Sequence, residues 1–283
     1  MGGLTNAEIA AALADWNSGD LSSFLVEISA AIFAKPDDRG EGDLIDKILD
    51  KTGMKGTGKW TVQQAADLSV AAPTIEASLD ARFLSGIKEE RVAAAAFFEA
   101  RGVAAPAPAR GVDKAALVAR VRSALYASKI CSYAQGMNII RAKSEAMGWD
   151  IDLGALARIW KGGCIIRAAF LDDIRAAYAR DPSLPSLLID PMFGDALAAR
   201  AGDWRAVVSD AVLAGVAVPG MTASLSYFDT YRRARLPANL VQAQRDFFGS
   251  HTYERVDGQE GWFHTLWSAG NSADSITTSG YTK

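Results

Sequence analysis

The sequence predicts an all-α protein that contains a duplicated helical-bundle unit. Apolar residues recur every three or four positions, as in Leu21, Leu25, Ile28 and Ile32, which is the spacing of one face of an α-helix. Alternating runs of β-branched residues, the usual signal for strands, are scarce. Similar segments also recur at a fixed separation, which is typical of a repeated helical unit whose copies cover each other's apolar faces.

The repeat has a separation of about 146 residues. Residues 70–73 (VAAP) recur as residues 216–219 (VAVP), and 216 − 70 is 146. The other matches, at separations of 146 or 144, are Phe24-Leu25 with Phe170-Leu171, Trp16 with Trp160, and Trp60 with Trp204. Several matches in one order indicate a duplication rather than chance.

Local signals place the helix starts. Thr5 followed by Glu8 is a capping box, which predicts that a helix begins just after Thr5. Pro73 and Pro219 are predicted to lie in the first turn of a helix, where the missing N–H of proline has no helical partner to lose. Residues 44–51 carry apolar residues at helical spacing and are also predicted to be helical.

The domain boundaries follow from a break in the periodic pattern. Residues 104–111, rich in Ala and Pro, predict a linker. We therefore expect copy one at about 1–103 and copy two at about 112–235, followed by a final helix and a C-terminal tail over 236–283.

One long helix is predicted from Asp113 to about Met147, with a length of ~50 Å at 1.5 Å per residue. Subtracting the repeat separation gives its counterpart in copy one, since 113 − 146 is −33 and 147 − 146 is 1. The counterpart would lie almost wholly before Met1. We therefore expect this chain to lack the first long helix of copy one and whatever precedes that helix.

Residues 55–61 (KGTGKWT) form the most informative segment for function. They combine two ammonium groups, two hydroxyls and two glycines ahead of an apolar helical pattern. Glycine lets backbone N–H groups approach a ligand closely, and a helix N-terminus adds partial positive charge. The segment therefore predicts an anion site, with phosphate as the expected ligand, although a glycine-rich turn with a solvated lysine pair would also fit the segment alone.

A nucleotide-triphosphate loop is the other interpretation of this region, because residues 53–59 satisfy G-x-x-x-x-G-K. That loop requires Ser or Thr directly after the lysine to hold Mg²⁺, but Trp60 stands there. It also follows a buried strand, whereas the preceding residues are predicted to be helical. These two failures argue against a triphosphate site.

Composition excludes several function classes. The chain has 283 residues, 49% of them hydrophobic, and a formal net charge of −3, so nucleic acid is not the expected partner. Two cysteines and two histidines are too few for a disulfide framework or a metal cluster, and we expect no metal. No apolar run approaches the roughly 20 residues of a membrane span. We expect a cytoplasmic protein with no membrane partner.

Several segments together resemble the decarboxylating 6-phosphogluconate dehydrogenases. They span nearly the whole chain in the family's order and are residues 16–28 (WNSGDLSSFLVEI), 55–61 (KGTGKWT), 81–85 (ARFLS), 236–249 (LPANLVQAQRDFFG), 251–254 (HTYE) and 262–267 (WFHTLW). The resemblance implies the duplicated, all-helical C-terminal domain of that family. The family's N-terminal Rossmann domain, which binds NADP, has no counterpart here, because no G-x-G-x-x-G follows a strand.

The resemblance also implies the site residues. Lys55, Thr57 and Arg82 would contact the phosphate end of 6-phosphogluconate in one subunit. Arg245 and His251 would reach into the partner subunit's pocket, so the site would require a homodimer that exchanges its tails. These residue types suit a phosphate dianion, which Arg meets as a bidentate fork and Lys as a point charge. Taken alone, Arg82 or His251 would more often be a solvated surface residue.

The reaction implied by the resemblance is oxidative decarboxylation of 6-phosphogluconate to ribulose 5-phosphate, a step of the pentose phosphate pathway. A hydride passes from C3 to NADP, CO₂ leaves the resulting β-keto acid, and an acid protonates the enediol. The family's catalytic lysine and glutamate lie on the long helix that we expect to be missing. We therefore assign no catalytic residue in this chain, leave its cofactor contacts unassigned and expect the isolated polypeptide to be inactive.

The alternative from another class is a helical scaffold or interaction protein that kept the packing and lost catalysis. The seven tryptophans are predicted to belong mainly to the core in either case.

Overall fold

The computed structural model describes residues 2–53, 55–103, 112–267 and 276–277. The chain divides into two compact units, Met1–Phe228 and Asp229–Lys283. The predicted linker, residues 104–111, lies outside the described residues, and the predicted domain boundaries stay a prediction. The all-α prediction is confirmed, and the only strands in the described part of the chain are two residues each, β1 (Phe263–His264) paired antiparallel with β2 (Ile276–Thr277).

The helical elements follow one another in this order: α1 Asn6–Asn17, α2 Phe24–Phe33, the 3₁₀ helix η1 Leu44–Lys47, α3 Gly58–Asp67, α4 Pro73–Gly86, α5 Lys88–Glu99, α6 Lys114–Met147, α7 Leu153–Ile159, α8 Phe170–Arg180, the 3₁₀ helix η2 Leu187–Ile189, α9 Pro191–Leu213, α10 Pro219–Tyr231 and α11 Ala238–Gly249. Within the described residues, no helix is both long enough and apolar enough to cross a bilayer.

The predicted helix starts are confirmed. The Thr5 hydroxyl accepts the backbone N–H of Glu8 at 3.2 Å, and the Glu8 carboxylate accepts the Thr5 N–H at 2.6 Å, which completes the capping box. Pro73 and Pro219 are the first residues of α4 and α10. The starts of α2 and α8, at Phe24 and Phe170, are also 146 residues apart.

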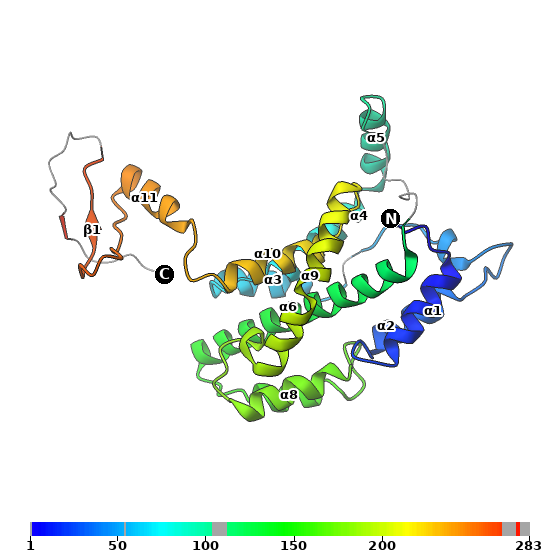
Figure 1. Cartoon of the computed structure of the whole chain (residues 1–283), viewed down its shortest axis with the longest axis horizontal. Helices are drawn as coiled ribbons and strands as arrows, with labels where there is room; N and C mark the ends of the chain where they lie inside the picture. The colour runs from blue at the N-terminus through cyan, green and yellow to red at the C-terminus, as the bar shows by residue number, and fades with distance from the viewer. Residues whose placement is uncertain (1, 54, 104–111, 268–275, 278–283) are drawn as a thin grey trace. The chain divides into compact units, whose positions relative to one another are not determined.

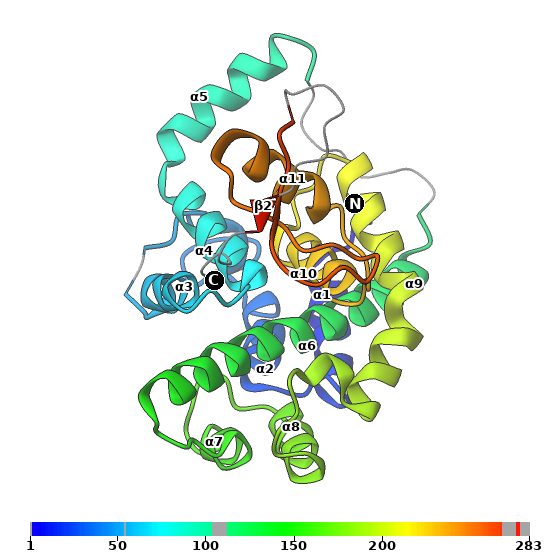
Figure 2. The ribbon, with the colours of Figure 1, turned by 90° about the vertical axis from the view of Figure 1, so that its left-hand side faces the viewer.

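Helix α6 is the central element of the first unit. Figures 1 and 2 both show it between α8 on one side and α3, α4 and α10 on the other. Its 34 residues confirm the predicted long helix, and they give a length of ~51 Å. The fully buried Phe170 ring packs against this helix. Its centroid lies 5.8 Å from the ring centroid of Tyr126 and 5.1 Å from that of Tyr133, both on α6, and 5.1 Å from that of Phe193 on α9.

Two sequence predictions are wrong in part. Only Leu44–Lys47 of the stretch 44–51 is helical, because Asp50 is bound to α5 through the Arg91 guanidinium, which contacts both its carbonyl (2.9 Å) and its carboxylate (3.1 Å).

The second concerns the tryptophans, which were predicted to belong mainly to the core. Trp16 and Trp204 are buried core residues, but Trp60 and Trp149 are 66% and 55% exposed. Both exposed tryptophans line the large groove described below.

Candidate functional site

Thr52 and Gly58, which flank the Lys55–Thr57 stretch in the chain, both contact α4. At one end, the Thr52 N–H donates to the Ser85 hydroxyl at 3.1 Å. At the other end, Gly58 lies against Leu79, since an added Cβ on Gly58 would be 3.4 Å from Leu79 Cδ1. Arg82 lies between Leu79 and Ser85 on α4, three residues from each. The structure therefore brings the stretch that contains Lys55 and Thr57 next to the turn that carries Arg82.

The N-terminus of α3 is open at this point. Thr57 is its N-cap residue, but the Thr57 side chain makes no capping hydrogen bond. The Thr57 carbonyl accepts the backbone N–H of Thr61 at 2.9 Å and its hydroxyl at 3.1 Å. The first N–H groups of α3 and the Thr57 hydroxyl are therefore left available to an anion.

Lys55 and Arg82 are the cationic groups at this position. Both are exposed, and neither forms an ion pair with any residue that the structure describes. The neighbouring Asp50 is already neutralised by Lys88 and Arg91, whose hydrogen bonds lower the pKa of the Asp50 carboxyl to about 2. Positive charge thus remains uncompensated at Lys55 and Arg82, which favours an anionic ligand.

The triphosphate interpretation gains no support from the local fold. The element before the glycines is the 3₁₀ helix η1 rather than a strand, and Trp60 holds the position that the Mg²⁺-binding hydroxyl would need.

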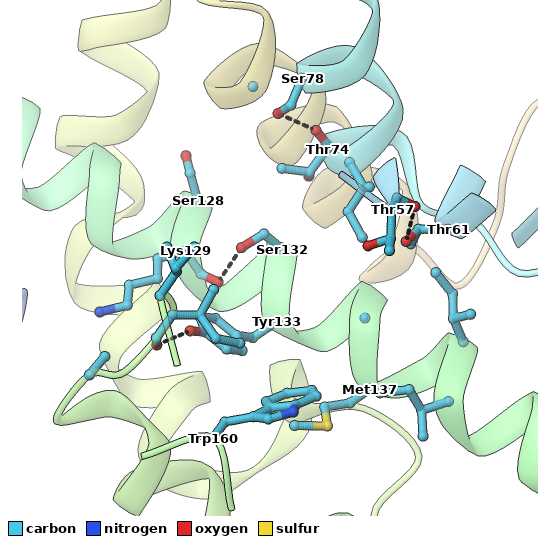
Figure 3. Close-up of a pocket in the computed structure, with 18 of the residues that line it drawn as sticks. Thr57, Thr61, Thr74, Ser78, Ser128, Lys129, Ser132, Tyr133, Met137 and Trp160 are labelled. Atoms are coloured by element: carbon cyan, nitrogen blue, oxygen red, sulfur yellow. Dashed lines mark hydrogen bonds between the residues drawn. The ribbon is translucent and has the colours of Figure 1, made fainter. Parts of the chain in front are cut away.

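A groove of about 1200 Å³ begins at Thr57 and follows α6. Figure 3 shows Thr57, Thr61, Thr74 and Ser78 on one side of it, facing α6. The lining residues from α6 recur every three or four positions and are Leu125, Ser128, Lys129, Ser132, Tyr133, Gly136, Met137, Ile139, Ile140 and Lys143. One face of α6 therefore lines the groove over 19 residues, a rise of ~27 Å from Leu125 to Lys143, and this lining is mainly apolar with small residues between.

Lys129 is the principal ionisable group on this face, and sequence analysis missed it. Its ammonium lies 4.9 Å above the Phe170 ring, and its Nζ is buried without a hydrogen-bond partner. Burial lowers the pKa of Lys129 to about 8. The adjacent Ser128 hydroxyl is also buried and unpartnered. The sequence signal that could have indicated these positions is a serine and a lysine within the mainly apolar pattern of this helix face.

Arg245 and His251 belong to the second unit. Helix α11 spans Ala238–Gly249. Arg245 is therefore in the last turns of α11 and His251 in the turn that follows. His251 is exposed, and Arg245 is partly buried without an ion pair among the described residues.

Asp246 organises this part of the second unit. Its carboxylate is fully buried and accepts four hydrogen bonds, from the Thr252 N–H (3.0 Å), the Thr265 N–H (3.0 Å), His264 Nδ1 (2.9 Å) and Trp267 Nε1 (2.8 Å). Burial alone would raise the pKa of Asp246, but these donors together lower it. The ionised carboxylate therefore joins α11 to the two segments that follow it.

Other kinds of chemistry find little support in the described residues. They contain no group of three or more His, Cys, Asp or Glu side chains that could hold a metal ion. Cys131 is buried, and burial raises the pKa of its thiol to about 12, which disfavours a nucleophilic thiolate. The arrangement is suited to binding an anion rather than to metal or thiol chemistry.

Comparisons with known proteins give a consistent result. A family model described as the C-terminal domain of 6-phosphogluconate dehydrogenase matches residues 1–267. The chain is 65% identical over 270 residues to decarboxylating 6-phosphogluconate dehydrogenase 2, chloroplastic, of Spinacia oleracea, which covers 95% of this chain and 50% of that protein. It is 64% identical over 267 residues to decarboxylating 6-phosphogluconate dehydrogenase 2 of Arabidopsis thaliana, covering 94% and 55%.

A solved structure is also similar. The 6-phosphogluconate dehydrogenase of Plasmodium falciparum, described in its apo form, with NADP⁺ and with 6-phosphogluconate, has a TM-score of 0.89 and 43% sequence identity to this chain. The match covers 93% of this chain and 56% of that one. The chain thus spans about half the length of the curated relatives it matches.

Proposed function

This chain belongs to the 6-phosphogluconate dehydrogenase C-terminal domain family, and from that membership we propose that it is the substrate-binding and dimerisation part of such an enzyme. The whole enzyme would oxidise and decarboxylate 6-phosphogluconate to ribulose 5-phosphate with NADP. The observation that carries the proposal is the course of the Lys55–Thr57 stretch along the Arg82 turn, between the Thr52–Ser85 and Gly58–Leu79 contacts.

In this proposal Lys55, Thr57 and Arg82 bind the phosphate group of the sugar acid. Arg82 offers a bidentate fork, Lys55 a mobile point charge and Thr57 a neutral donor beside the open N-terminus of α3. The phosphate is not the reacting end of the substrate. Its binding energy would serve to orient the distant carbon at which oxidation occurs.

The second part of the proposal is a homodimer in which Arg245 and His251 reach the partner subunit's phosphate. Support comes from the surface of α11, where Leu240, Val241, Phe247 and Phe248 are all more than half exposed. A helix with that much exposed apolar area is typical of an element that packs against another surface.

NADP does not fit the described residues by themselves. A dinucleotide site of the family's type needs a parallel sheet with a glycine-rich turn at the start of a helix. The strands in the described part of this chain are only the pair β1 and β2. We therefore propose that NADP is bound mainly outside these 283 residues and that this polypeptide alone does not turn over.

The groove along α6 also supports the proposal that the whole enzyme contains a further part that packs against this domain. Ser128, Ser132 and Gly136 are spaced four residues apart and leave room for the close approach of another helix. We propose that a long helix equivalent to α6, the counterpart that the repeat predicts in copy one, packs there in the whole enzyme. It would cover the exposed Trp60 and Trp149.

Cytoplasm remains the proposed location, with the chloroplast as the alternative, since some of the plant relatives carry chloroplastic in their names. Fluorescent fusion of the complete gene product, observed in cells of its source, would distinguish the two compartments.

Calorimetric titration with 6-phosphogluconate tests the binding proposal directly. We expect measurable binding to the purified chain, a loss of most of it in Arg82→Ala, and no loss in the control Arg39→Ala, which removes an exposed arginine from a loop of the same unit. Equal binding by the Arg82 variant and the parent chain would refute the assigned site.

Enzyme activity is tested separately, by mixing the chain with NADP⁺ and 6-phosphogluconate and recording absorbance of the reduced nicotinamide. We expect no turnover, and appreciable turnover would refute the proposed inactivity. If the purified chain is dimeric but binds no sugar phosphate, the result would instead favour the alternative function, a helical scaffold or interaction protein.

A further inference from the structure

The imidazole of His251 occupies the space that a side chain at position 249 would need. A Cβ added to Gly249 would lie 2.7 Å from His251 Nε2 and 2.8 Å from its Cδ2, well inside contact distance. Gly249 is the last residue of α11, and its φ is not in the left-handed region. Since the backbone there suits any residue, and glycine is less favourable than alanine in a helix, the absence of a side chain calls for another reason.

The turn that carries His251 is held against α11 on both sides. Ser250 adopts a left-handed conformation (φ 50°), and its N–H donates to the Asp246 carbonyl at 2.9 Å. The Thr252 N–H donates to the Asp246 carboxylate at 3.0 Å, and Gln242 Nε2 donates to the Thr252 carbonyl at 2.5 Å. The backbone of His251 is thus fixed, and only its side-chain torsions remain to place the ring.

The ring is placed on a particular face of the helix. It lies edge-on to Phe248, with ring centroids 6.1 Å apart and planes at 79°. Gln242, Arg245 and Gly249 are spaced by three and four residues, so they share one face of α11. A ring resting over Gly249 therefore lies on the face that carries Arg245.

We propose that Gly249 is a positioning residue: by lacking a side chain, it lets the His251 imidazole rest on the Arg245 face of α11, from which both groups address the same phosphate ester. The functional meaning of this arrangement rests on the proposed function, in which Arg245 and His251 bind that phosphate. The arrangement itself lies wholly within the second unit.

The chain offers a direct spectroscopic test, because it contains only two histidines, His251 and His264. We would label histidine with ¹³C and record the imidazole signals of the full chain and of Gly249→Ala. We expect the variant to lose the nuclear Overhauser contact between the His251 ring and the α-proton at 249, and the His251 signals to shift. The His264 signals, which report the Asp246 network, should stay in place.

Gly202→Ala is the matched control, since Gly202 lies within α9 and a Cβ there would meet nothing within 4 Å. It should change neither histidine. Retention of the His251 ring contact in Gly249→Ala would overturn the proposal.

A general loss of structure in Gly249→Ala is also informative. If the clash with the imidazole causes it, the double variant Gly249→Ala/His251→Ala should recover the His264 signals, because the ring is gone. If the double variant stays disordered, Gly249 serves something other than His251, and the proposal is wrong.

Titration with 6-phosphogluconate then separates this inference from the proposed function. We expect the His251 signals of the parent chain to respond to 6-phosphogluconate, and those of Gly249→Ala to require more of it. If the parent chain does not respond, the phosphate role of His251 fails, while the ring-contact result still decides whether Gly249 positions the imidazole.

Discussion

The hydroxyl oxygens of Thr74 and Ser224 lie 2.9 Å apart, although 150 residues separate them in the chain. Both residues are buried, Thr74 at the start of α4 and Ser224 in α10. Ser224 donates its only hydroxyl hydrogen to the Gly220 carbonyl at 2.7 Å, so Thr74 must be the donor between the two. Thr74 also accepts from Gln135 Nε2 of α6 at 2.8 Å. One hydroxyl therefore connects three helices.

Replacing Thr74 by Val should lower the free energy of unfolding by about 1–3 kcal/mol, because Val keeps the shape but leaves the buried Gln135 amide without its acceptor. Urea denaturation followed by circular dichroism measures the change. Thr74→Ser keeps the hydroxyl and should retain most of the stability. Equal stability of the Val variant and the parent chain would show that the Gln135 amide finds another partner.

Much of the fold could be predicted from sequence because its signals are local. The capping box at Thr5, the prolines at positions 73 and 219, and the uninterrupted stretch of α6 each act within one or two turns. The prediction failed at residues 44–51, where the apolar spacing is helical but Arg91, from another helix, binds Asp50 and holds the segment outside a helix. Contacts of that kind have no signature in the periodicity.

Less of the candidate site than of the fold could be predicted from the sequence, and its assignment stays a prediction. Residue types indicated an anion site at Lys55 and Thr57, and the family resemblance added Arg82, Arg245 and His251. The burial of Lys129 could not be predicted, because its neighbour Phe170 is far along the chain. The same is true of the four donors that converge on Asp246, two of which come from residues 264 and 265.

Asp246→Asn should disorder the segments that follow α11. All four partners of the carboxylate donate hydrogen bonds, and an Asn amide would turn two hydrogens of its own toward them. We expect a loss of about 2–4 kcal/mol in the second unit, since bonds to a charged acceptor are typically worth about 1.5–3 kcal/mol each.

Limited proteolysis would detect the change as faster cleavage between residues 250 and 267. Asp257→Asn is the control, because it removes an exposed carboxylate of the same unit that pairs with Arg255. Unchanged cleavage in Asp246→Asn would mean that the buried network does not hold these segments.

Arg245→Ala should weaken 6-phosphogluconate binding by about 10- to 100-fold, the equivalent of about 1.5–3 kcal/mol for one charge-assisted contact. The fold should be little affected, because Arg245 forms no ion pair with the described residues. Calorimetry measures the affinity, and Arg235→Ala, at an exposed position of the same unit, controls for the loss of positive charge. Equal losses in both variants would indicate a general electrostatic effect rather than a specific contact.

Lys129 should make the stability of the chain depend on pH in the alkaline range. Burial lowers its pKa from 10.5 to about 8, so between these values the unfolded chain binds the proton and the folded chain does not. Stability therefore rises with pH across this window, since it rises wherever the unfolded state holds more protons. Below about pH 8 the folded chain must instead bury the ammonium.

Lys129→Met removes that cost, so the variant should gain most in melting temperature relative to the parent chain below about pH 8, and its advantage should shrink as pH rises toward 10.5. Differential scanning fluorimetry at a series of pH values measures the difference. Lys129→Gln, which is also neutral throughout, should give the same slope. A difference in melting temperature that does not change with pH would show that the ammonium escapes to water in the folded chain.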